Sequence, residues 1–409
     1  MSVPIPTIIP AKLAYLASAE GASLLRQITL DAREDLALAG SPALRSLEPW
    51  KRAALLEQRA LRVKALRKQP RAAEMLFTAL GQQQMTTEAV AIYKAGRLPE
   101  GVRTIADLCC GLGGDSMRLP ADIAVLGVDL SEETLRAWRH NTSLYRDKLT
   151  WAVRADVTRL ETQGGKVDGV FLDPARRTLA ESYTERDFDA EPEPGWEALA
   201  AVTRRFGNAA LKLSPGTRLP DLFENAECEY IGLRDECLEL TVRTGAFGRP
   251  GWVRAAELHP DGVGGFTAAI VEAPAVDLDA TFGNVAEPGA WFYEPVKSVV
   301  RAHLFGVVAE QHGLWQLDAR LAYLGGDRRV ESPLLKRYRV IKVLGVDEAV
   351  LKAEIKAAEV GILEIKKRGL DIKPEEWRKK LKPKGPNSAT LVFTRLMGKA
   401  SVLWVERDD

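Results

Sequence analysis

The chain has 409 residues and a formal charge of +1 at pH 7, and 46% of its residues are hydrophobic and 28% charged. This is the balance of a soluble globular protein, and the length suffices for two or three domains. The four cysteines show no C-x-x-C spacing, so we expect no paired disulfides, no metal and a reducing compartment. Because the apolar start lacks a basic leader and no apolar run approaches about 18 residues, the sequence predicts a cytoplasmic protein without a signal peptide or membrane span.

The N-terminal part, residues 1–95, is predicted to be a helical domain because Ala, Leu, Arg and Glu dominate it. Apolar residues recur at helical spacing between Lys51 and Arg71, among many cations. Two interpretations stay open for these cations: a solvated face of an amphipathic helix, or a face that contacts phosphates. Thr86-Thr87-Glu88 then indicates a helix start with a threonine cap and an acid in the first turn, and that helix should end near Arg97.

From residue 101 the pattern changes to strand, helix, strand, and we expect an α/β domain over residues 96–280. Ser131 is expected to cap the helix after the second strand. Five apolar runs followed by an alternating antiparallel pair predict a doubly wound, seven-stranded Rossmann-like sheet in which the last strand inserts beside the fifth. The expected strands are 105–108, 123–128, 151–153, 167–172, 209–213, 228–233 and 238–242.

The remainder, residues 285–409, is predicted to be a small α+β domain. Two more strands flank the Gly-rich turn at 260–265, and loop composition over 277–289 indicates the domain boundary. The elements expected after it are a helix over 295–311, a strand over 339–344, a helix from Asp347, a strand over 362–366, a helix from Lys373, and strands over 390–394 and 401–405.

A Gly-rich turn after the first strand carries the clearest chemical signal. The apolar run at 105–108 leads into Gly111, Gly113 and Gly114, and the next strand stops at Asp129. A turn that lets backbone approach a ligand, with an acid placed for ribose hydroxyls, indicates a nucleotide-like cofactor. This turn would fit NAD as well as S-adenosylmethionine.

Three further acids favour S-adenosylmethionine. Asp107 lies inside the first strand, where a dinucleotide fingerprint is purely apolar. Asp156 follows the third strand and could accept a hydrogen bond from an adenine amino group. Asp173-Pro174 closes the fourth strand, at the carboxyl edge where open α/β sheets bind ligands.

The segment Asp107-Leu-Cys-Cys-Gly-Leu-Gly-Gly-Asp115 resembles motif I of class I S-adenosylmethionine-dependent methyltransferases, especially the version in trimethylguanosine synthase. With Asp173-Pro-Ala-Arg-Arg177 and Leu363–Gly369, the chain is similar to bacterial methyltransferases that carry a THUMP-like domain. The resemblance implies that the Gly-rich turn and Asp107 face the methionine moiety, Asp129 the ribose, and Asp156 with Val157 the adenine. The implied cofactor-binding set is Thr86, Asp107, Cys109, Gly111, Gly113, Gly114, Asp115, Asp129, Leu130, Asp156 and Val157.

On the acceptor side, Asp173-Pro174 stands where related enzymes have Asp/Asn-Pro-Pro-aromatic, a motif that grips the exocyclic amine of a base. Here Ala175 replaces the second proline and Arg176 the aromatic. The arginine also resembles the Asp-Pro-Pro-Arg of RNA 5-methyluridine enzymes. Those enzymes need a cysteine nucleophile after the fifth strand, and because 213–216 contains none, we reject a covalent mechanism. The implied catalytic residues are Asp173, Pro174 and Arg176, acting mainly by alignment.

Two groups of cations are candidates for binding the substrate. Arg176 and Arg177 could pair with the acids of 181–193 or bind a phosphate or carboxylate. The cations between Lys366 and Lys384 are either solvated surface or a phosphate-binding patch. The predicted substrate-binding set is Arg177, Lys366, Lys367, Arg368, Lys379 and Lys380.

The sequence therefore predicts an S-adenosylmethionine-dependent methyltransferase that acts on RNA, with a base amine as acceptor and the basic C-terminal domain docking the nucleic acid. No membrane or metal is expected as a partner. Two alternatives stay open. One is a methyltransferase for a small molecule or protein, and the other is an RNA-binding protein whose methyltransferase fold no longer catalyses.

Overall fold

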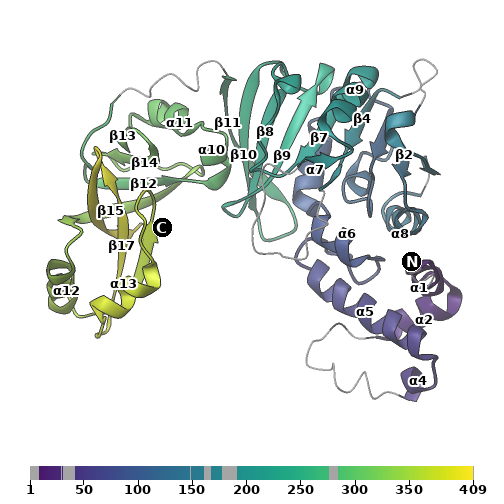
Figure 1. The fold of residues 1–409 in the computed structure, drawn as a ribbon, viewed down its shortest axis with the longest axis horizontal. Helices are drawn as coiled ribbons and strands as arrows, with labels where there is room; N and C mark the ends of the chain where they lie inside the picture. Colours follow the sequence, from purple (N-terminus) through teal and green to yellow (C-terminus); the bar gives the residue numbers. More distant parts are fainter. Residues whose placement is uncertain are drawn as a thin grey trace, which may run out of the picture. The chain divides into compact units, whose positions relative to one another are not determined.

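The computed structural model describes residues 9–28, 30, 42–147, 149–160, 167–176, 191–275 and 284–408 (Figure 1). The chain divides into two compact units, residues 1–227 with 240–250 and residues 228–239 with 251–409. This division places 251–275 in the second unit, whereas the sequence analysis grouped them with the α/β domain. The predicted boundary near 280 falls among residues 276–283, which lie outside the described residues, so the three-domain division stays a prediction.

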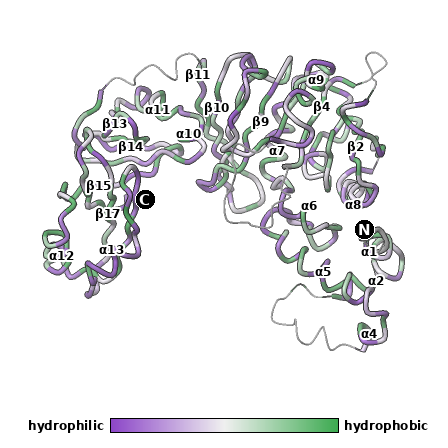
Figure 2. The backbone as a smooth tube through the Cα atoms, in the orientation of Figure 1, coloured by the Kyte–Doolittle hydropathy of each residue, from purple (hydrophilic) through white to green (hydrophobic). Residues whose placement is uncertain are grey.

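Helices form the first part of the chain, as predicted. α5 begins at a proline, which suits the first turn of a helix, and hydrophobic and hydrophilic residues alternate along it in Figure 2. Its residues Leu55 and Ala65 are buried against Met75 and Leu76. The described helices are α1 (Ile9–Leu16), α2 (Ala19–Gln27), α4 (Pro42–Arg45), α5 (Pro49–Ala65), α6 (Ala79–Gln84) and α7 (Glu88–Gly96).

The cations of this region contribute more to packing than either interpretation from sequence expected. The guanidinium of Arg62 is buried and donates from Nε to the carbonyl oxygen of Met75 at 2.9 Å. Burial lowers the pKa of Arg62 to about 10. Lys68 donates to the carbonyl oxygens of Gln82 and Gln83, at 3.1 and 2.5 Å. Arg62 therefore fixes the segment that follows α5, and Lys68 fixes the C-terminal end of α6.

The first unit contains the predicted parallel sheet. Its strand order is β9-β7-β4-β1-β2-β3, with β9 antiparallel to β7 and the others parallel. Ser131 caps α8 as expected, its hydroxyl accepting from the backbone N–H of Thr134 at 3.2 Å. The elements are β1 (Thr104–Leu108), β2 (Ala124–Asp129), α8 (Glu132–Ser143), β3 (Thr150–Arg154), β4 (Gly169–Leu172), β5 (Ala175–Arg176), β6 (Pro192–Glu193), α9 (Trp196–Phe206), β7 (Ala209–Leu213) and β9 (Glu236–Thr244).

The strand order continues from β9 as β9-β8-β10-β11, with β8 (Glu227–Leu233), β10 (Trp252–Pro260) and β11 (Phe266–Pro274). The predicted antiparallel pair is thus β8 and β9. β10 lies parallel to β8 and antiparallel to β11, so the described sheet has nine strands rather than the seven expected. The two additional strands are the pair that the sequence placed around the turn at 260–265.

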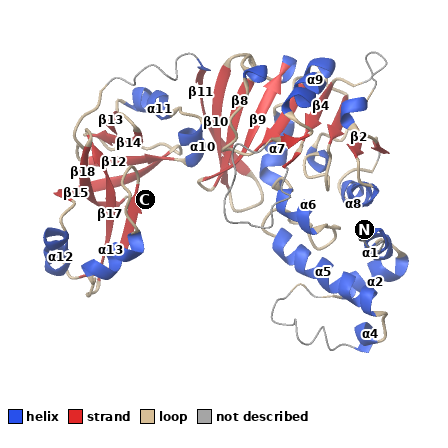
Figure 3. Ribbon diagram, in the orientation of Figure 1, coloured by secondary structure: helices blue, strands red, loops and turns tan. Residues whose placement is uncertain are grey.

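A second sheet, shown in red with its helices in blue in Figure 3, has the order β13-β14-β12-β15-β18-β17-β16. The expected helix over 295–311 is wrong: His303 is left-handed (φ 58°) and separates two short helices. The strands β12, β13 and β14 were not predicted from the sequence. The elements are β12 (Trp291–Pro295), α10 (Lys297–Arg301), α11 (Phe305–His312), β13 (Trp315–Asp318), β14 (Leu321–Gly326), β15 (Leu335–Gly345), α12 (Glu348–Ala357), β16 (Val360–Lys367), α13 (Pro374–Leu381), β17 (Asn387–Leu396) and β18 (Lys399–Arg407).

Candidate active site

The carboxyl ends of the parallel strands meet at one edge of the sheet, as the sequence analysis expected. Leu108 is paired with Val128 on one side and with Leu172 on the other. Just beyond, the backbone N–H of Asp173 donates to the carbonyl oxygen of Leu108 at 3.1 Å. The Gly-rich turn, Asp129 and Asp173 therefore follow neighbouring strand ends.

Glycine is required in this turn for two different reasons. Gly113 has φ +86°, and a Cβ there would lie 3.1 Å from Cδ1 of Trp138. Gly111 has φ +52°, yet a Cβ there would meet no heavy atom of the described protein within 4 Å. Gly113 lets the turn pack against α8, whereas Gly111 presents backbone to open space, which a bound ligand can approach.

The acids after β2 and β3 are held by backbone and hydroxyl groups. Asp129 accepts from the backbone N–H of Ser131 at 2.9 Å and from that of Gly111 at 3.3 Å. Burial raises the pKa of Asp129 above its ordinary value despite these bonds. Asp156 accepts from the hydroxyl and the backbone N–H of Thr158, at 2.7 and 3.0 Å, and both bonds lower its pKa. These acids are fixed in orientation before any ligand binds.

Two apolar side chains accompany these acids. Leu130, directly after Asp129, is 65% exposed, and Val157, directly after Asp156, is buried. An exposed leucine beside an acid at a strand end is a surface on which a planar ring can pack. The arrangement suits a ribose and its attached base.

Asp107 lies beneath the turn, fully buried. It accepts a hydrogen bond from the hydroxyl of Ser116, which in turn accepts from Nε1 of Trp138 at 3.1 Å. Burial raises the pKa of Asp107 well above its ordinary value, and the nearby carboxylates of Asp115 and Asp173 raise it further. A carboxyl group in this environment is stabilised by a ligand that brings positive charge.

Sequence reasoning missed Lys94, which lies on the apolar face of α7. Its Nζ is 2.8 Å from Oδ1 of Asp115, and Thr86 donates to the other oxygen of Asp115 at 3.1 Å. Burial alone would raise the pKa of Asp115, but Lys94, with Lys212 and Thr86, holds it below its ordinary value. Thr86 and Asp115, predicted to bind the cofactor, thus bind each other and support the turn. Their direct contact with the cofactor stays a prediction.

Lys212 is the second residue that sequence reasoning missed. Its Nζ is 2.7 Å from Oδ2 of Asp173 and 2.9 Å from the carbonyl oxygen of Gln84. A lysine inside the otherwise apolar strand β7, directly at the carboxyl edge, is a signal that the sequence contained. Lys212, Asp173 and Asp107 all line one small cavity in the first unit.

The other acceptor-side residues are only partly described. Pro174 is buried and Ala175 exposed, and the backbone of Ala175 and Arg176 pairs with residues 192 and 193 as β5 and β6. The predicted residue Arg177 lies outside the described residues, as do most of the acids proposed to pair with it. Cys109 has φ 56°, and burial raises its thiol pKa, which agrees with a structural cysteine in the turn.

The cations predicted to bind nucleic acid have different environments. Lys366 donates to Glu294 at 2.7 Å and to the hydroxyl of Tyr338 at 2.6 Å; although burial lowers its pKa, these partners raise it overall. Arg368 donates to the carbonyl oxygen of Ala322 at 2.9 Å. Both residues therefore hold the second unit together. Lys367 and Lys379 are exposed, and Lys380 lies 3.5 Å from Glu348.

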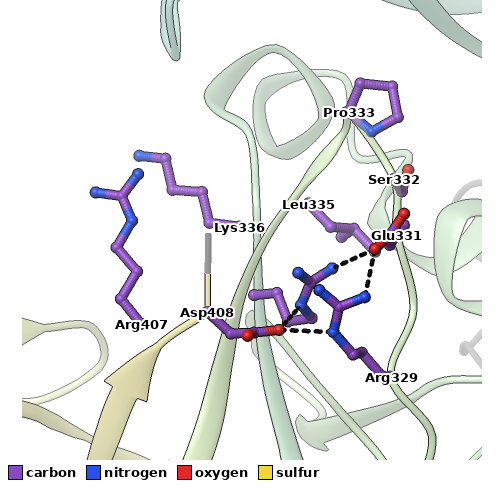
Figure 4. Close-up of a pocket in the computed structure, with 9 residues that line it drawn as sticks. Arg329, Glu331, Ser332, Pro333, Leu335, Lys336, Arg407 and Asp408 are labelled. Atoms are coloured by element: carbon purple, nitrogen blue, oxygen red, sulfur yellow. Dashed lines mark hydrogen bonds and ion pairs between the residues drawn. The ribbon is translucent and has the colours of Figure 1, made fainter.

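A cavity of about 530 Å³ lies in the second unit (Figure 4). Asp408 accepts from Arg329 at 2.9 Å and from Arg337, and Lys336 pairs with Asp235. These ion pairs compensate the charges of Arg329, Arg337 and Lys336. The lining residues are Arg329, Glu331, Ser332, Pro333, Leu335, Lys336, Arg337, Arg407 and Asp408.

Within the described parts of the chain, no helix is long and apolar enough to cross a membrane. In the same parts, no group of three His, Cys, Asp or Glu residues is arranged to hold a metal ion.

Residues 335–407 match the THUMP domain-like family. An uncharacterized S-adenosylmethionine-dependent methyltransferase of Mycobacterium tuberculosis is 31% identical over 334 residues, which cover 79% of this chain and 85% of that protein. The chain belongs to the S-adenosylmethionine-dependent methyltransferases. This methyltransferase has the same fold as a protein from Porphyromonas gingivalis W83 whose crystal structure is assigned as a methyltransferase. The TM-score is 0.76, and the two chains are 21% identical, with 100% of each covered. A 97-residue stretch, 22% of each chain, is 36% identical to the 23S rRNA (uracil(1939)-C(5))-methyltransferase of Marinomonas posidonica.

Proposed function

We propose that this methyltransferase modifies RNA, with a base entering the site at Asp173. The observation that carries the proposal is the position of Asp173, which follows β4 directly and is bonded to the end of β1 next to the Gly-rich turn. A carboxylate there can orient an acceptor group toward the cofactor. The THUMP-like segment and the similarity to an enzyme named for a uracil of rRNA support RNA as the acceptor.

The described residues fit S-adenosylmethionine, which supplies a methyl group on a positively charged sulfur. Asp107, whose pKa is raised by burial, would be stabilised by the positive charges of the methionine end. Asp129 would accept from the ribose hydroxyls, and the exposed side chain of Leu130 would pack on the adenine. Gly111 would let the backbone approach the ligand.

The exposed cations of the C-terminal region would dock the RNA. Among the described residues, Lys379, Lys382 and Lys384 are exposed and have no carboxylate within ion-pair distance. Trp377 and the cations near it combine an aromatic ring with positive charge, a combination common in nucleic-acid binding. Binding that neutralises phosphates weakens as the salt concentration rises. For single-stranded RNA, each tenfold rise in salt lowers the logarithm of the binding constant by roughly 0.7 for every phosphate contacted.

The acceptor expected from sequence is the exocyclic amine of a base, gripped by Asp173 and the following carbonyl. For an amine acceptor of this kind, catalysis would rest on alignment of the acceptor lone pair with the methyl group rather than on strong acid–base chemistry. The covalent route stays rejected, because both cysteines described outside the turn, Cys228 and Cys237, lie on β8 and β9 rather than after β7.

The proposal is tested with purified protein, tritiated S-adenosylmethionine and bulk RNA from cells that lack the protein. We expect label in RNA with the wild type, and loss of that label with Asp173→Ala while S-adenosylhomocysteine still binds. Labelling of protein or metabolites with no labelling of RNA would overturn the proposal. Cofactor binding that is present in the wild type and lost in Asp129→Ala would exclude a fold that has lost the cofactor site.

A further inference from the structure

We infer that Lys212 and Asp173 act together on the acceptor and select a base edge with adjacent ring N–H and carbonyl groups, as in guanine or uracil. This inference rests on the proposed action on RNA and replaces the exocyclic amine with a more specific acceptor class. Its basis is the position of an ammonium group directly beside the carboxylate that meets the acceptor.

The two side chains are placed by neighbouring parallel strands. Leu172 of β4 is paired with Leu211 of β7, so Asp173 and Lys212 are the next residues along each strand. Nζ of Lys212 is 2.7 Å from Oδ2 of Asp173, and both side chains stay partly accessible, at 16% and 33%. The pair is thus formed by the register of the sheet, and both side chains lie within reach of a molecule at its edge.

Lys212 is already oriented toward a carbonyl oxygen. Its ammonium lies 2.9 Å from the backbone carbonyl oxygen of Gln84, at the end of α6. A carbonyl of a base can replace this oxygen on the ammonium. Asp173 then offers an acceptor beside this donor. An acceptor and a donor side by side match the N–H and C=O of a ring amide, in the way that carboxylate and amine side chains read base edges.

The charge of the pair disfavours an exocyclic amine. Methyl transfer to a neutral amine develops positive charge on nitrogen, and a neighbouring ammonium repels it. One oxygen of Asp173 is, in addition, engaged by Lys212. Transfer to a ring-amide nitrogen instead moves negative charge onto the adjacent carbonyl oxygen as the N–H proton leaves. A preorganised ammonium stabilises that charge.

The ring N–H proton passes to the carboxylate of Asp173, and the nitrogen electron pair forms the new N–CH₃ bond. The S–CH₃ bond breaks and its electron pair stays on sulfur, which leaves a neutral thioether. Lys212 keeps its proton and donates to the carbonyl oxygen throughout. Asp173 returns its proton to solvent after the product leaves.

Other titratable groups face the pair and bear on its pH dependence. Lys68 repels Lys212, and Asp115 attracts it. Asp107 and Cys109 interact electrostatically with Asp173. Lys94 lines the same cavity. A comparison between variants that differ only at Lys212 keeps these contributions constant.

The first test identifies the product nucleoside. Bulk RNA from cells lacking the protein is labelled with tritiated S-adenosylmethionine and digested, and the labelled nucleosides are separated. We expect label in ring-nitrogen-methylated guanosine or uridine. Label in an exocyclic amine, a carbon or a ribose hydroxyl would overturn this inference and leave the proposed function intact. An absence of label in RNA would instead overturn the proposed function.

The second test uses Lys212→Met and Lys212→Arg, with Lys64→Met, which removes an exposed lysine of α5, as the control. We expect kcat to fall by about 10²- to 10³-fold in Lys212→Met, as for removal of an oxyanion donor. Lys212→Arg should recover part of this loss, and the affinity for S-adenosylhomocysteine should stay unchanged in both variants.

The pH profile separates this role from a structural one. Lys212 lowers the effective pKa of the ring N–H, so the rate of the wild type should level off at a lower pH than that of Lys212→Met. Identical profiles, or an unchanged kcat in Lys212→Met, would contradict the inference. If Lys212→Met fails to fold in a thermal melt, the profile of Lys212→Arg and the product nucleoside decide the question.

Discussion

The buried ion pair between Lys94 and Asp115 gives a sharp prediction for stability. Its Nζ–Oδ1 distance is 2.8 Å, and only 3% of the lysine and 9% of the aspartate side chain are exposed. Lys94→Met leaves a carboxylate in the interior without its nearest cation, while Thr86 continues to donate to Oδ2. Removing one partner of a buried pair costs about 3–5 kcal/mol. Because the bond from Thr86 remains, we expect the free energy of unfolding to fall by about 3 kcal/mol.

The pH dependence of this loss has a defined sign. Because the pKa of Asp115 is lowered in the folded wild type, the pair stabilises the fold above the unfolded pKa of about 3.9 and ceases to do so as the pH falls through the folded pKa. In Lys94→Met, burial raises that pKa instead. The destabilisation is then complete at neutral pH and shrinks toward about pH 4, as the carboxyl takes up a proton.

Urea unfolding of the wild type and Lys94→Met, at about pH 7 and about pH 4.5, measures both quantities. The control is Lys94→Met combined with Asp115→Asn, which should recover much of the loss because neither charge remains buried. An equal loss at both pH values, or a loss below about 1 kcal/mol, would show that the pair is not a principal support of the turn.

Three further predictions concern the cofactor, the turn and the RNA. Asp129→Ala should weaken S-adenosylhomocysteine binding in calorimetry by roughly 10- to 150-fold, the value of about 1.5–3 kcal/mol for a hydrogen bond to a charged group, and an unchanged affinity would contradict the ribose contact. Gly113→Ala should lower the melting temperature, because its Cβ would lie 3.1 Å from Trp138. Gly111→Ala should mainly weaken cofactor binding. A larger loss of melting temperature in Gly111→Ala, or a larger loss of cofactor affinity in Gly113→Ala, would contradict these roles. Lys379→Glu should reduce the RNA affinity, and the salt dependence of binding should fall by the amount of about one phosphate contact. Lys64→Glu, also at an exposed lysine, is the control. Equal effects of the two substitutions would contradict a docking surface at Lys379.

The parallel core was predictable from sequence because its strands are short apolar runs, three of which lead to the acids Asp129, Asp156 and Asp173. The strand over 209–213 was predicted with the bounds that β7 has, and Ser131 was correctly placed as the cap of α8. These features depend on local pattern alone. The C-terminal elements from Asp347 onward were also predicted, since alternation and caps again determine them.

Features that depend on contacts between elements distant in sequence could not be predicted. Lys94 and Lys212 are single charges in apolar segments, and their partners are fixed only when α7 and β7 dock beside the turn and β4. The break at His303 needs a left-handed residue that no glycine signals. Arg62 and Lys366 resembled surface cations by composition, yet each is held by partners distant in sequence, a carbonyl of Met75 and the carboxylate of Glu294.

The most direct test of the central proposal is a comparison of RNA nucleosides from cells with and without the protein. We predict that one methylated nucleoside disappears from the deletion strain, and that the wild-type protein, but not Asp173→Ala, restores it. An identical set of methylated nucleosides in both strains, with methyl transfer found on protein or metabolites, would contradict the assignment of RNA as the substrate.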